Sequence, residues 1–372
     1  MDKLQLTKLK KIANNIEPII EFLLFPYIKV AGKNKWFEKA MLRPLMKGLS
    51  KSSGVSYLSY YSVPKQIDEI KPYENKEDFS DYCIILQGPI LYDDSFTLNT
   101  IKLYLRLFYN VKIVISTWKG IQEDFKVACE SLGVILVENE EPQNGGPLNI
   151  NFQLISSKNG ALKAKEIGCT YTAKTRTNQR FYARDWLSYI SNQLEIFLRL
   201  DPDHSRLLFT SYGMSYLKRP FCLCDNFSAG YTENIVNLYS TMLDEREKNY
   251  FKKCGEDTDA YALKIRYDLE PYKHCNHDVV ITREKFFNYM CPEEYIVYNY
   301  CNSYCFDIEK QKDIMTAYYR FLKNYVVIID EAQLQILWPK YSEYSSQKLN
   351  EHDYFGKLDY KKWLDIFLNW EE

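Results

Sequence analysis

The stretch Tyr82-Cys83-Ile84-Ile85-Leu86, followed at once by Gln87-Gly88-Pro89, decides the fold class of this chain. The run of apolar and aromatic residues has the length of a buried strand, and the Gly-Pro pair then interrupts it. We therefore predict a buried strand over 82–86 that ends in a tight turn.

The same change from an apolar run to a turn recurs down the chain, separated by segments with apolar residues at helical spacing. Alternation of strand and helix implies parallel strands joined by right-handed crossovers. The predicted strands are 82–86, 112–116, 134–137 and 169–175, the predicted helices between them are 96–109, 122–132 and 151–167, and two later strands are predicted at 206–211 and 325–330.

The predicted strands are rich in Val, Ile and Leu, but each ends in polar or turn-forming residues. In open parallel sheets, ligands bind at the carboxyl ends of the strands. The sequence therefore predicts a ligand site there, built from Gln87-Gly88-Pro89, Thr117-Trp118, Glu138-Asn139 and the block 174–180.

Several blocks of sequence carry a family resemblance through their order and spacing. They are ILQGPI at 85–90 with TLNTI at 97–101, VISTWKG at 114–120, GPLNIN at 146–151 with Gln153, KTRTNQR at 174–180, and a weaker block from Arg219-Pro220 to Asp225-x-Phe227-x-x-Gly230. Together they resemble the WavE family of lipopolysaccharide-synthesis proteins, regarded as glycosyltransferases of the GT-A type. The resemblance covers residues 82–230, with a fainter match at 292–300.

The resemblance and the order of elements imply an α/β fold: a GT-A-like (Rossmann-related), mostly parallel sheet flanked by helices, with a helical N-terminal extension. We expect a basic helical extension over 1–76, a nucleotide-sugar and acceptor domain over 77–310, and a C-terminal strand and helices over 311–372 that pack on the core. The implied activity is transfer of a sugar from a nucleotide-sugar donor to a lipopolysaccharide, lipooligosaccharide or capsule glycan acceptor.

Two other functions stay open on the sequence. One is a nucleotidyl- or phosphotransferase on a related sheet, which would need metal-binding carboxylates at the strand ends. The other is a catalytically silent member that binds only a nucleotide or a partner enzyme.

The fourth block departs from the family pattern, which usually reads Thr-Arg-Ser-Asp-Gln-Arg, because Thr177-Asn178 stands in place of Ser-Asp. A neutral Asn is a poor ligand for Mn²⁺ or Mg²⁺, which prefer carboxylate oxygen. We therefore favour a metal-free donor site; if a metal is used, Asp203 and Asp225 are its first candidate ligands. Lys174, Arg176 and Arg180 would neutralise the diphosphate, or else pair with acids at the sheet edge.

Neutral side chains at the other strand ends are predicted to contact the donor. Gln87, Thr117, Asn139, Asn178 and Gln179 offer hydrogen-bonding groups, and Gly88-Pro89 permits a close backbone approach. Trp118 either stacks on a ring of the donor or fills the core. Asn149, Asn151 and Gln153 either cap the following helix or contact the sugar.

Asp225 is the predicted catalytic base, because it lies in the apolar, Cys- and Phe-rich segment 221–227, where a carboxylate is costly unless it is paired or used. Glu294, next to Glu293, is the second candidate. The alternative for that pair is the acidic first turn of a helix that begins after Pro292.

The net charge of the 372-residue chain is −1, which argues against nucleic acid as a partner. Residues 1–52 hold eleven Lys or Arg against four acids, a local charge of +7. This segment either contacts an anionic inner-membrane surface or forms a cap with solvated lysines.

The ten cysteines come without a recognisable secretory signal, so we expect reduced, buried thiols in a cytoplasmic protein. Zinc is the less favoured reading of Cys222-x-Cys224, of Cys301-x3-Cys305 and of the His and Cys residues at 274–277, because their spacings fit no standard structural zinc site.

Overall fold

The computed structural model describes residues 67–71, 77–197, 205–212, 215–250, 283, 286–287, 290–339 and 356–371. The chain divides into two compact units, 1–63 and 64–372, and all described residues belong to the second. The predictions for the basic segment 1–52, for Asp203 and for residues 274–277 lie outside the described residues. So does the predicted helical extension over 1–76, except for residues 67–71.

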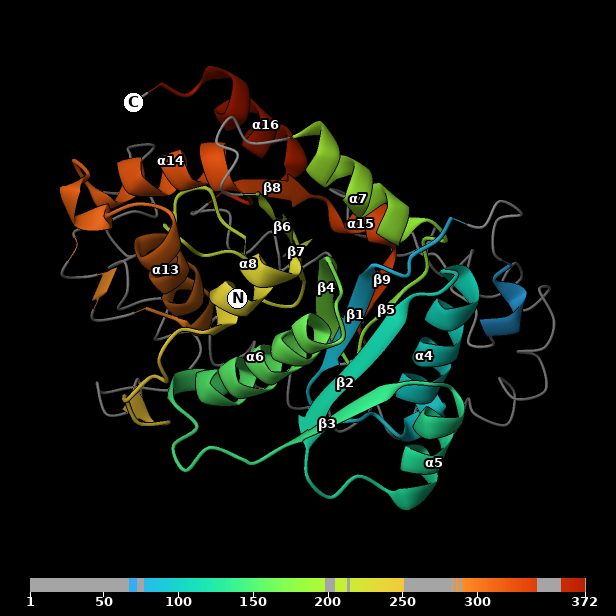
Figure 1. Cartoon of the computed structure of the whole chain (residues 1–372). Coiled ribbons are helices and arrows are strands. Elements are labelled where there is room, and N and C mark those ends of the chain that lie inside the picture. Colours follow the sequence, from blue (N-terminus) through green and yellow to red (C-terminus); the bar gives the residue numbers. More distant parts are fainter. Residues whose placement is uncertain are drawn as a thin grey trace, which may run out of the picture. The chain divides into compact units, whose positions relative to one another are not determined.

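A seven-stranded sheet forms the centre of the described part of the chain, in the order β3-β2-β1-β4-β7-β6-β8 (Figure 1). β1, β2, β3 and β4 are mutually parallel; β7 is antiparallel to both of its neighbours; β6 and β8 are parallel. The strands are β1 (Tyr82–Gln87), β2 (Lys112–Trp118), β3 (Ile135–Asn139), β4 (Tyr171–Arg176), β6 (Leu207–Thr210), β7 (Ser228–Tyr231) and β8 (Val326–Ile329).

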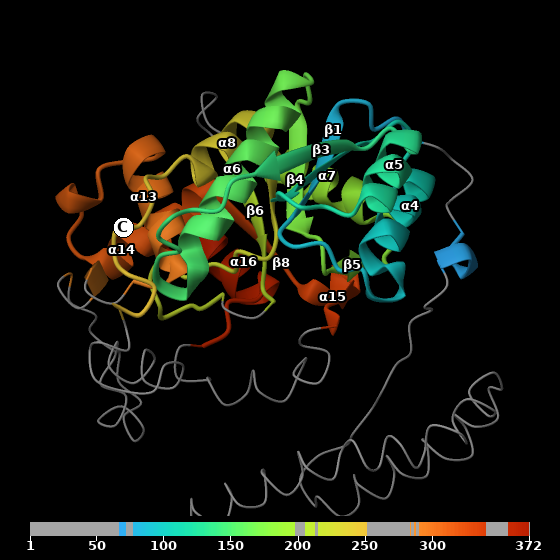
Figure 2. The ribbon, with the colours of Figure 1, turned by 90° about the horizontal axis from the view of Figure 1, so that it is seen from below.

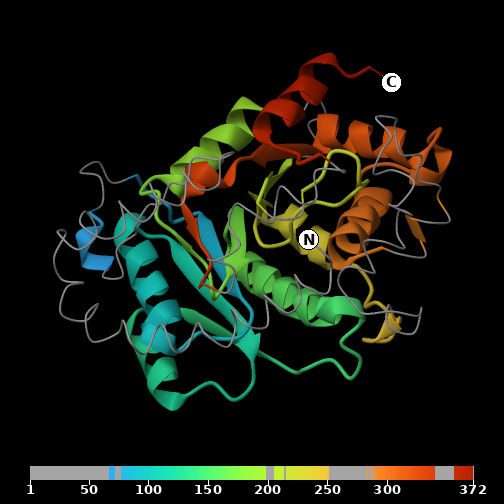
Figure 3. The same ribbon diagram turned by 180° about the vertical axis from the view of Figure 1, so that it is seen from behind.

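Helices cover both faces of the sheet. α6 (Ile150–Glu166) lies against β1 and β2 so closely that a Cβ on Gly160 would stand 2.7 Å from Ile85 Cγ2, and α8 (Thr232–Tyr239) packs beside α6. α7 (Trp186–Ile196) holds the opposite face, where Ser191 Oγ hydrogen-bonds the Tyr82 hydroxyl. α4 (Phe96–Leu107) and α5 (Glu123–Ser131) lie side by side (Figure 3).

The C-terminal elements complete the sheet at β8, at its far end from α4 and α5 (Figure 2). They are α13 (Pro292–Tyr304), α14 (Ile314–Tyr325), α15 (Glu331–Leu334) and α16 (Tyr360–Asn369), with a 3-10 turn at Ile308–Lys310. Other 3-10 turns lie earlier in the chain, at Ile67–Glu69, Asp93–Ser95 and Pro147–Asn149. α16 docks through Trp363, which is fully buried and donates a hydrogen bond from Nε1 to Leu322 O at 3.1 Å. None of the helices in the described ranges combines the length and the apolar character that a membrane crossing requires.

The predicted fold class, a mostly parallel sheet flanked by helices, is confirmed. Each predicted strand and helix from 82 to 175 is present with its ends shifted by at most a few residues, and the strands near 206–211 and 325–330 are also present. The sequence did not predict β7, whose Ser-Ala-Gly-Tyr run lacks large apolar residues. Gly230 suits that strand because a Cβ there would meet the Arg206 carbonyl at 3.2 Å. The sequence analysis also missed the small antiparallel sheet of β5 (Arg180–Phe181) and β9 (Ile336–Leu337).

Candidate functional site

The carboxyl ends of β1 and β4 meet where the order of strands along the sheet reverses. From β1 the chain adds β2 and β3 on one side, and α6 then returns it to place β4 on the other side. Gln87 at the end of β1 and Arg176 at the end of β4 are neighbours in the strand register. Open α/β sheets bind ligands at such a switch point, so this pair marks the centre of the candidate site.

The loops that follow β1 and β4 are tied to each other. Thr177 N–H donates to Gln87 O at 3.1 Å, and the Thr177 hydroxyl donates to Pro89 O. The Thr97 hydroxyl in turn donates to Thr177 O at 2.9 Å. Gly88 has φ +109°, a conformation that side chains other than Gly rarely adopt. The Gly88-Pro89 turn therefore lies at the switch point, where Gly88 N–H donates to Ser116 O at 3.0 Å.

Gln87, Gln153 and Gln179 each have an amide atom that no described residue satisfies. The first two lie at the end of β1 and at the start of α6. Gln87 is 3% exposed, and its Nε2 donates to Ser156 Oγ at 2.7 Å, but its Oε1 has no partner among the described residues. Gln153, in the first turn of α6, is 8% exposed and its Nε2 likewise has no described partner. Buried polar atoms are normally paired, so both amides are suited to a ligand.

Arg176 and Asn178 lie at the end of β4 and just after it, and both are partly exposed. Arg176 Nε and Asn178 Oδ1 have no hydrogen-bond partner among the described residues. The Arg176 guanidinium lies 5.6 Å from the centroid of the Trp338 ring, which in turn contacts the Tyr212 ring. The sequence analysis missed Trp338 and Tyr212. Trp338 follows β9, and no local sequence pattern predicts the pairing of β9 with β5.

Lys174 is fully buried, so its ammonium group is not placed as that of a phosphate-binding lysine would be. Nζ donates to the backbone oxygen of Asp225 at 2.6 Å and lies 5.3 Å from the Tyr239 ring centroid. Burial lowers the pKa of Lys174 to about 8, an effect that the nearby Asp225 carboxylate opposes and the Arg176 charge reinforces. The predicted donor contact by Lys174 is thus replaced by a role inside the protein, holding the Asp225 backbone.

Asp225 is partly exposed and lies three residues before β7. The Asp225 carboxylate favours the charged form of Lys174. The pKa of Glu293 is raised first by burial, then by the neighbouring Cys291 and then by Asp225. The arrangement brings a carboxylate, a buried ammonium and the end of β4 together. A partly exposed carboxylate beside the end of β4 is a candidate for a general base.

Glu294, the second predicted base, is enclosed. It is 1% exposed, its Oε1 accepts from Arg219 Nε at 2.7 Å, and its Oε2 accepts from the Cys291 N–H at 2.8 Å. α13 begins at Pro292, so Glu293 and Glu294 form its acidic first turn, and Glu294 closes a capping box. Glu294 therefore belongs to the acidic first turn of a helix, which was the alternative prediction for this pair, and its carboxylate is enclosed by Arg219 and the Cys291 N–H.

Arg180 also differs from its predicted role. It is 3% exposed; Nε donates to Thr100 Oγ1 at 3.0 Å, Nη2 donates to Phe96 O at 2.9 Å, and the guanidinium lies 4.3 Å from the Phe96 ring centroid. These contacts fix the start of α4 to β5, which leaves Arg180 inside the protein. Gln179 is fully buried as well; its Oε1 accepts from Thr175 Oγ1 at 3.0 Å, and its Nε2 has no partner among the described residues.

Asn139 serves the sheet rather than a ligand. It is 3% exposed; Nδ2 donates to Ser116 Oγ and Thr117 O, and Oδ1 accepts from Asn159 Nδ2 at 2.7 Å. Thr117 is 2% exposed. Trp118 is partly exposed and packs edge-to-face on Phe152, with ring centroids 5.0 Å apart. Asn139 thus links β2, β3 and α6, and its predicted donor contact is not available.

Asn149 and Asn151 have separate roles. Asn149 is exposed at the N-terminus of α6 with φ +64° and makes no capping hydrogen bond through its side chain, so it is open to solvent at the site edge. Asn151 is 1% exposed and joins two loops: Nδ2 donates to Asn144 O and Asp244 O, and Oδ1 accepts from Asp244 N. Of the predicted set, Pro89, Trp118, Asn149, Arg176, Asn178 and Asp225 are at least partly exposed, and Gln87, Gln153 and Gln179 each keep an amide atom with no hydrogen-bond partner among the described residues.

No protein-family model matches the chain, and no curated protein matches it in sequence. Solved structures with partial likeness include a 4-diphosphocytidyl-2C-methyl-D-erythritol synthase from Anaerococcus prevotii, with 12% identity, coverage of 56% of this chain and 95% of that one, and a TM-score of 0.30. An inositol-1-phosphate CTP transferase from T. maritima has 11% identity, coverage of 46% and 78%, and a TM-score of 0.29. A cytidylyltransferase from Leptospira borgpetersenii has 12% identity, coverage of 63% and 97%, and a TM-score of 0.27. A likeness at this level assigns no function.

Proposed function

We propose that this chain is a glycosyltransferase that transfers a sugar from a nucleotide-sugar donor to a lipopolysaccharide, lipooligosaccharide or capsule glycan. The observation that carries the proposal is the pairing of Gln87 with Arg176 at the switch point of the sheet, both with unused hydrogen-bonding atoms. The resemblance of blocks 85–90 and 174–180 to the WavE family supports the same assignment.

In this proposal the nucleotide lies over the Gly88-Pro89 turn, with Gln87 and Gln153 contacting its base or ribose. Arg176 binds the diphosphate, because a guanidinium pairs well with phosphate oxygens and stabilises the charge that develops on the leaving group. Asn178 supplies a neutral hydrogen bond where the family pattern has a carboxylate, so the donor is bound without Mn²⁺ or Mg²⁺.

Asp225 is the proposed base of an inverting transfer. Its carboxylate takes the proton of the acceptor hydroxyl as that oxygen forms a bond to the anomeric carbon of the sugar. The bond from the anomeric carbon to the diphosphate breaks, and the electron pair leaves with the nucleoside diphosphate beside Arg176. The acceptor reaches this site from the cytoplasmic surface of the inner membrane, with residues 1–52 as the proposed membrane contact.

The test is the thermal stability of the purified chain against a panel of nucleoside diphosphates and nucleotide sugars, each with and without Mn²⁺ or Mg²⁺. A ligand that binds only the folded state raises the melting temperature, and saturation at about 100 times Kd adds about 2.7 kcal/mol of stability. We expect one nucleotide family to stabilise the protein without a metal requirement.

Arg176→Met should weaken that ligand by about tenfold or more, since a hydrogen bond to a charged group contributes about 1.5–3 kcal/mol. Arg320→Met, on α14 at the other end of the sheet, is the matched control and should leave the shift unchanged. A panel with no stabilising nucleotide, or equal shifts in both variants, would remove Arg176 from the donor site.

A further inference from the structure

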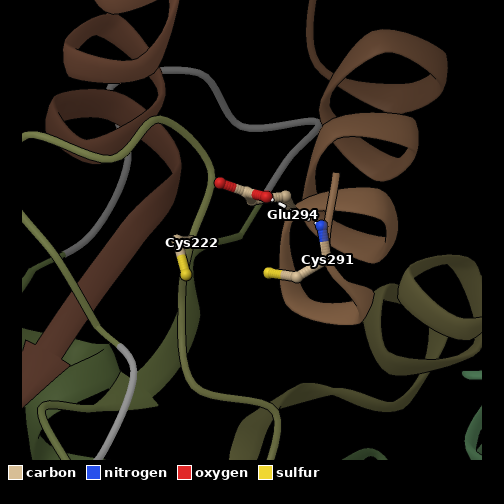
Figure 4. A group of neighbouring side chains, drawn as sticks. All are labelled: Cys222, Cys291 and Glu294. Atoms are coloured by element: carbon tan, nitrogen blue, oxygen red, sulfur yellow. Dashed lines mark hydrogen bonds between the residues drawn. The ribbon is translucent and has the colours of Figure 1, made fainter. Parts of the chain in front are cut away.

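A cluster of ligating side chains lies beyond the candidate donor site, between the loop before β7 and the start of α13. Cys222, Cys291 and Glu294 each place one ligand atom within 4.8 Å of the others, and all three are buried. Figure 4 shows the two sulfur atoms facing each other, with the Glu294 carboxylate beside them. Cys222 and Cys291 are far apart in sequence, so spacing alone gave no sign of this group.

The contacts inside the cluster bring a fourth acidic group into it. The Cys291 sulfur is in hydrogen-bond contact with Cys222 and with the Glu293 carboxyl, and as the helix N-cap it accepts the Glu294 N–H. Glu293 Oε2 is buried and has no hydrogen-bond partner among the described residues. Glu294 keeps its ion pair with Arg219, a side chain that is itself fully buried.

Apolar packing does not account for this composition. A lone buried thiol behaves as a small apolar group, but here two sulfur atoms lie within 4.8 Å of each other and of a carboxylate oxygen, and a second carboxyl group contacts Cys291. Arg219 balances the charge of Glu294, and the two thiols are neutral until a metal replaces their protons. Thiolates and carboxylates are costly to bury unless they are paired or coordinate a metal, and a divalent cation would bind both sulfur atoms and the Glu294 carboxylate together.

We propose that Cys222, Cys291 and Glu294, whose ligand atoms lie within 4.8 Å of one another, bind a structural Zn²⁺. Thiolate sulfur and carboxylate oxygen are both zinc ligands, and structural sites are commonly four-coordinate and closed to solvent. On binding, each thiol releases its proton to solvent and the sulfur donates an electron pair to the metal. The ion fastens the loop 221–227, which carries Asp225, to α13.

This site is independent of the proposed transferase activity, because metal content is measured without any donor or acceptor. The full chain is produced without a polyhistidine tag, dialysed, and analysed for metals by plasma mass spectrometry. We expect about one zinc per chain, as for a closed structural site. Cys222→Ser and Cys291→Ser should each lower the zinc content by about tenfold or more, since ligand loss removes most of the affinity.

The matched control is Cys83→Ser, because Cys83 and Cys169 form another buried thiol pair in hydrogen-bond contact, outside any ligand cluster of the described residues. It should retain its zinc. Zinc retained in both Cys222→Ser and Cys291→Ser would place the metal elsewhere and overturn the proposal, as would a metal-free wild-type chain.

A second measurement needs no variant. Wild-type protein unfolded with reductant and chelator is refolded in Co²⁺, and we expect the near-ultraviolet charge-transfer absorption of thiolate-bound cobalt. Absence of that band in refolded protein would overturn the proposal. Mass analysis of the alkylated wild-type chain covers the remaining outcome: a disulfide between Cys222 and Cys291 would replace the zinc site with a covalent link.

Discussion

Replacing Lys174 by Met tests the environment of the most deeply buried charge at the candidate site. The substitution keeps the length of the side chain but removes the ammonium, its hydrogen bond to Asp225 O and its contact with the Tyr239 ring. The pKa of Lys174 falls from 10.5 to about 8 because burial disfavours the charged form. A fall of that size corresponds to about 3 kcal/mol of folding free energy.

The sign of the pH dependence follows from linkage. Below about pH 8 the lysine is charged in the folded and the unfolded chain, and the folded state carries the full cost of burial. Between the folded and unfolded pKa values the unfolded chain binds more protons, so the stability of the wild type rises with pH. The Met variant has no such group. The free energy of unfolding of the wild type should therefore rise by about 2 kcal/mol relative to that of the Met variant between about pH 7 and pH 9.5.

The assay is denaturant unfolding of both proteins at several pH values in this range, followed by tryptophan fluorescence. The other titrating groups are common to both proteins and largely cancel in the difference. Lys102→Met, at an exposed position of α4, is the control and should show a constant difference from wild type. A constant difference for Lys174→Met as well would refute the reasoning, because Lys174 would then titrate alike in both states.

Three further predictions concern the site and the helix that frames it. Asp225→Asn should lower kcat by about 10²- to 10⁴-fold, as loss of a general base does, while the nucleotide-induced melting shift is retained; unchanged turnover would exclude Asp225 as the base. Asn178→Asp should make donor binding respond to Mn²⁺ in calorimetric titration, because a carboxylate oxygen is added where the wild type has an amide; the same titration without metal is the control. Gly160→Val should destabilise the protein by about 1–3 kcal/mol in denaturant unfolding, since its Cβ would lie 2.7 Å from Ile85 Cγ2; a variant as stable as wild type would mean that α6 can move away from the sheet.

The half of the sheet built from β1 to β4 could be predicted because its signals are local. Each strand is an apolar run of the right length, and each crossover helix has apolar residues at its own period. β7 could not be predicted in this way. Its identity comes from being flanked by β4 and β6, where small residues allow close approach, and this is a property of the neighbours rather than of its own residues.

The candidate site could be predicted as a region, but the part played by each residue could not. Sequence identifies polar residues at strand ends, yet it does not say whether their hydrogen bonds go inward or to a ligand. Asn139 and Gln87 end strands at the same edge of the sheet. Asn139 bonds to β2 and α6, whereas Gln87 keeps one oxygen without a partner in the part of the chain that the structure describes. That difference depends on which residues α6 places over each strand end.

The block 174–180 shows how strand geometry separates similar side chains. Successive residues of a strand face opposite sides of the sheet, so Lys174 and Arg176 share the face that α6 and α8 cover. Lys174 lies one step deeper and is enclosed by α8 through Tyr239, whereas Arg176 lies at the strand end and is partly exposed. The chain then turns, and Arg180 in β5 contacts the start of α4, where its Nη2 donates to Phe96 O. Three bases that look alike in sequence therefore differ in place. Lys174 holds the Asp225 backbone, Arg180 anchors the start of α4, and Arg176 is partly exposed at the candidate site, where we propose that it binds phosphate.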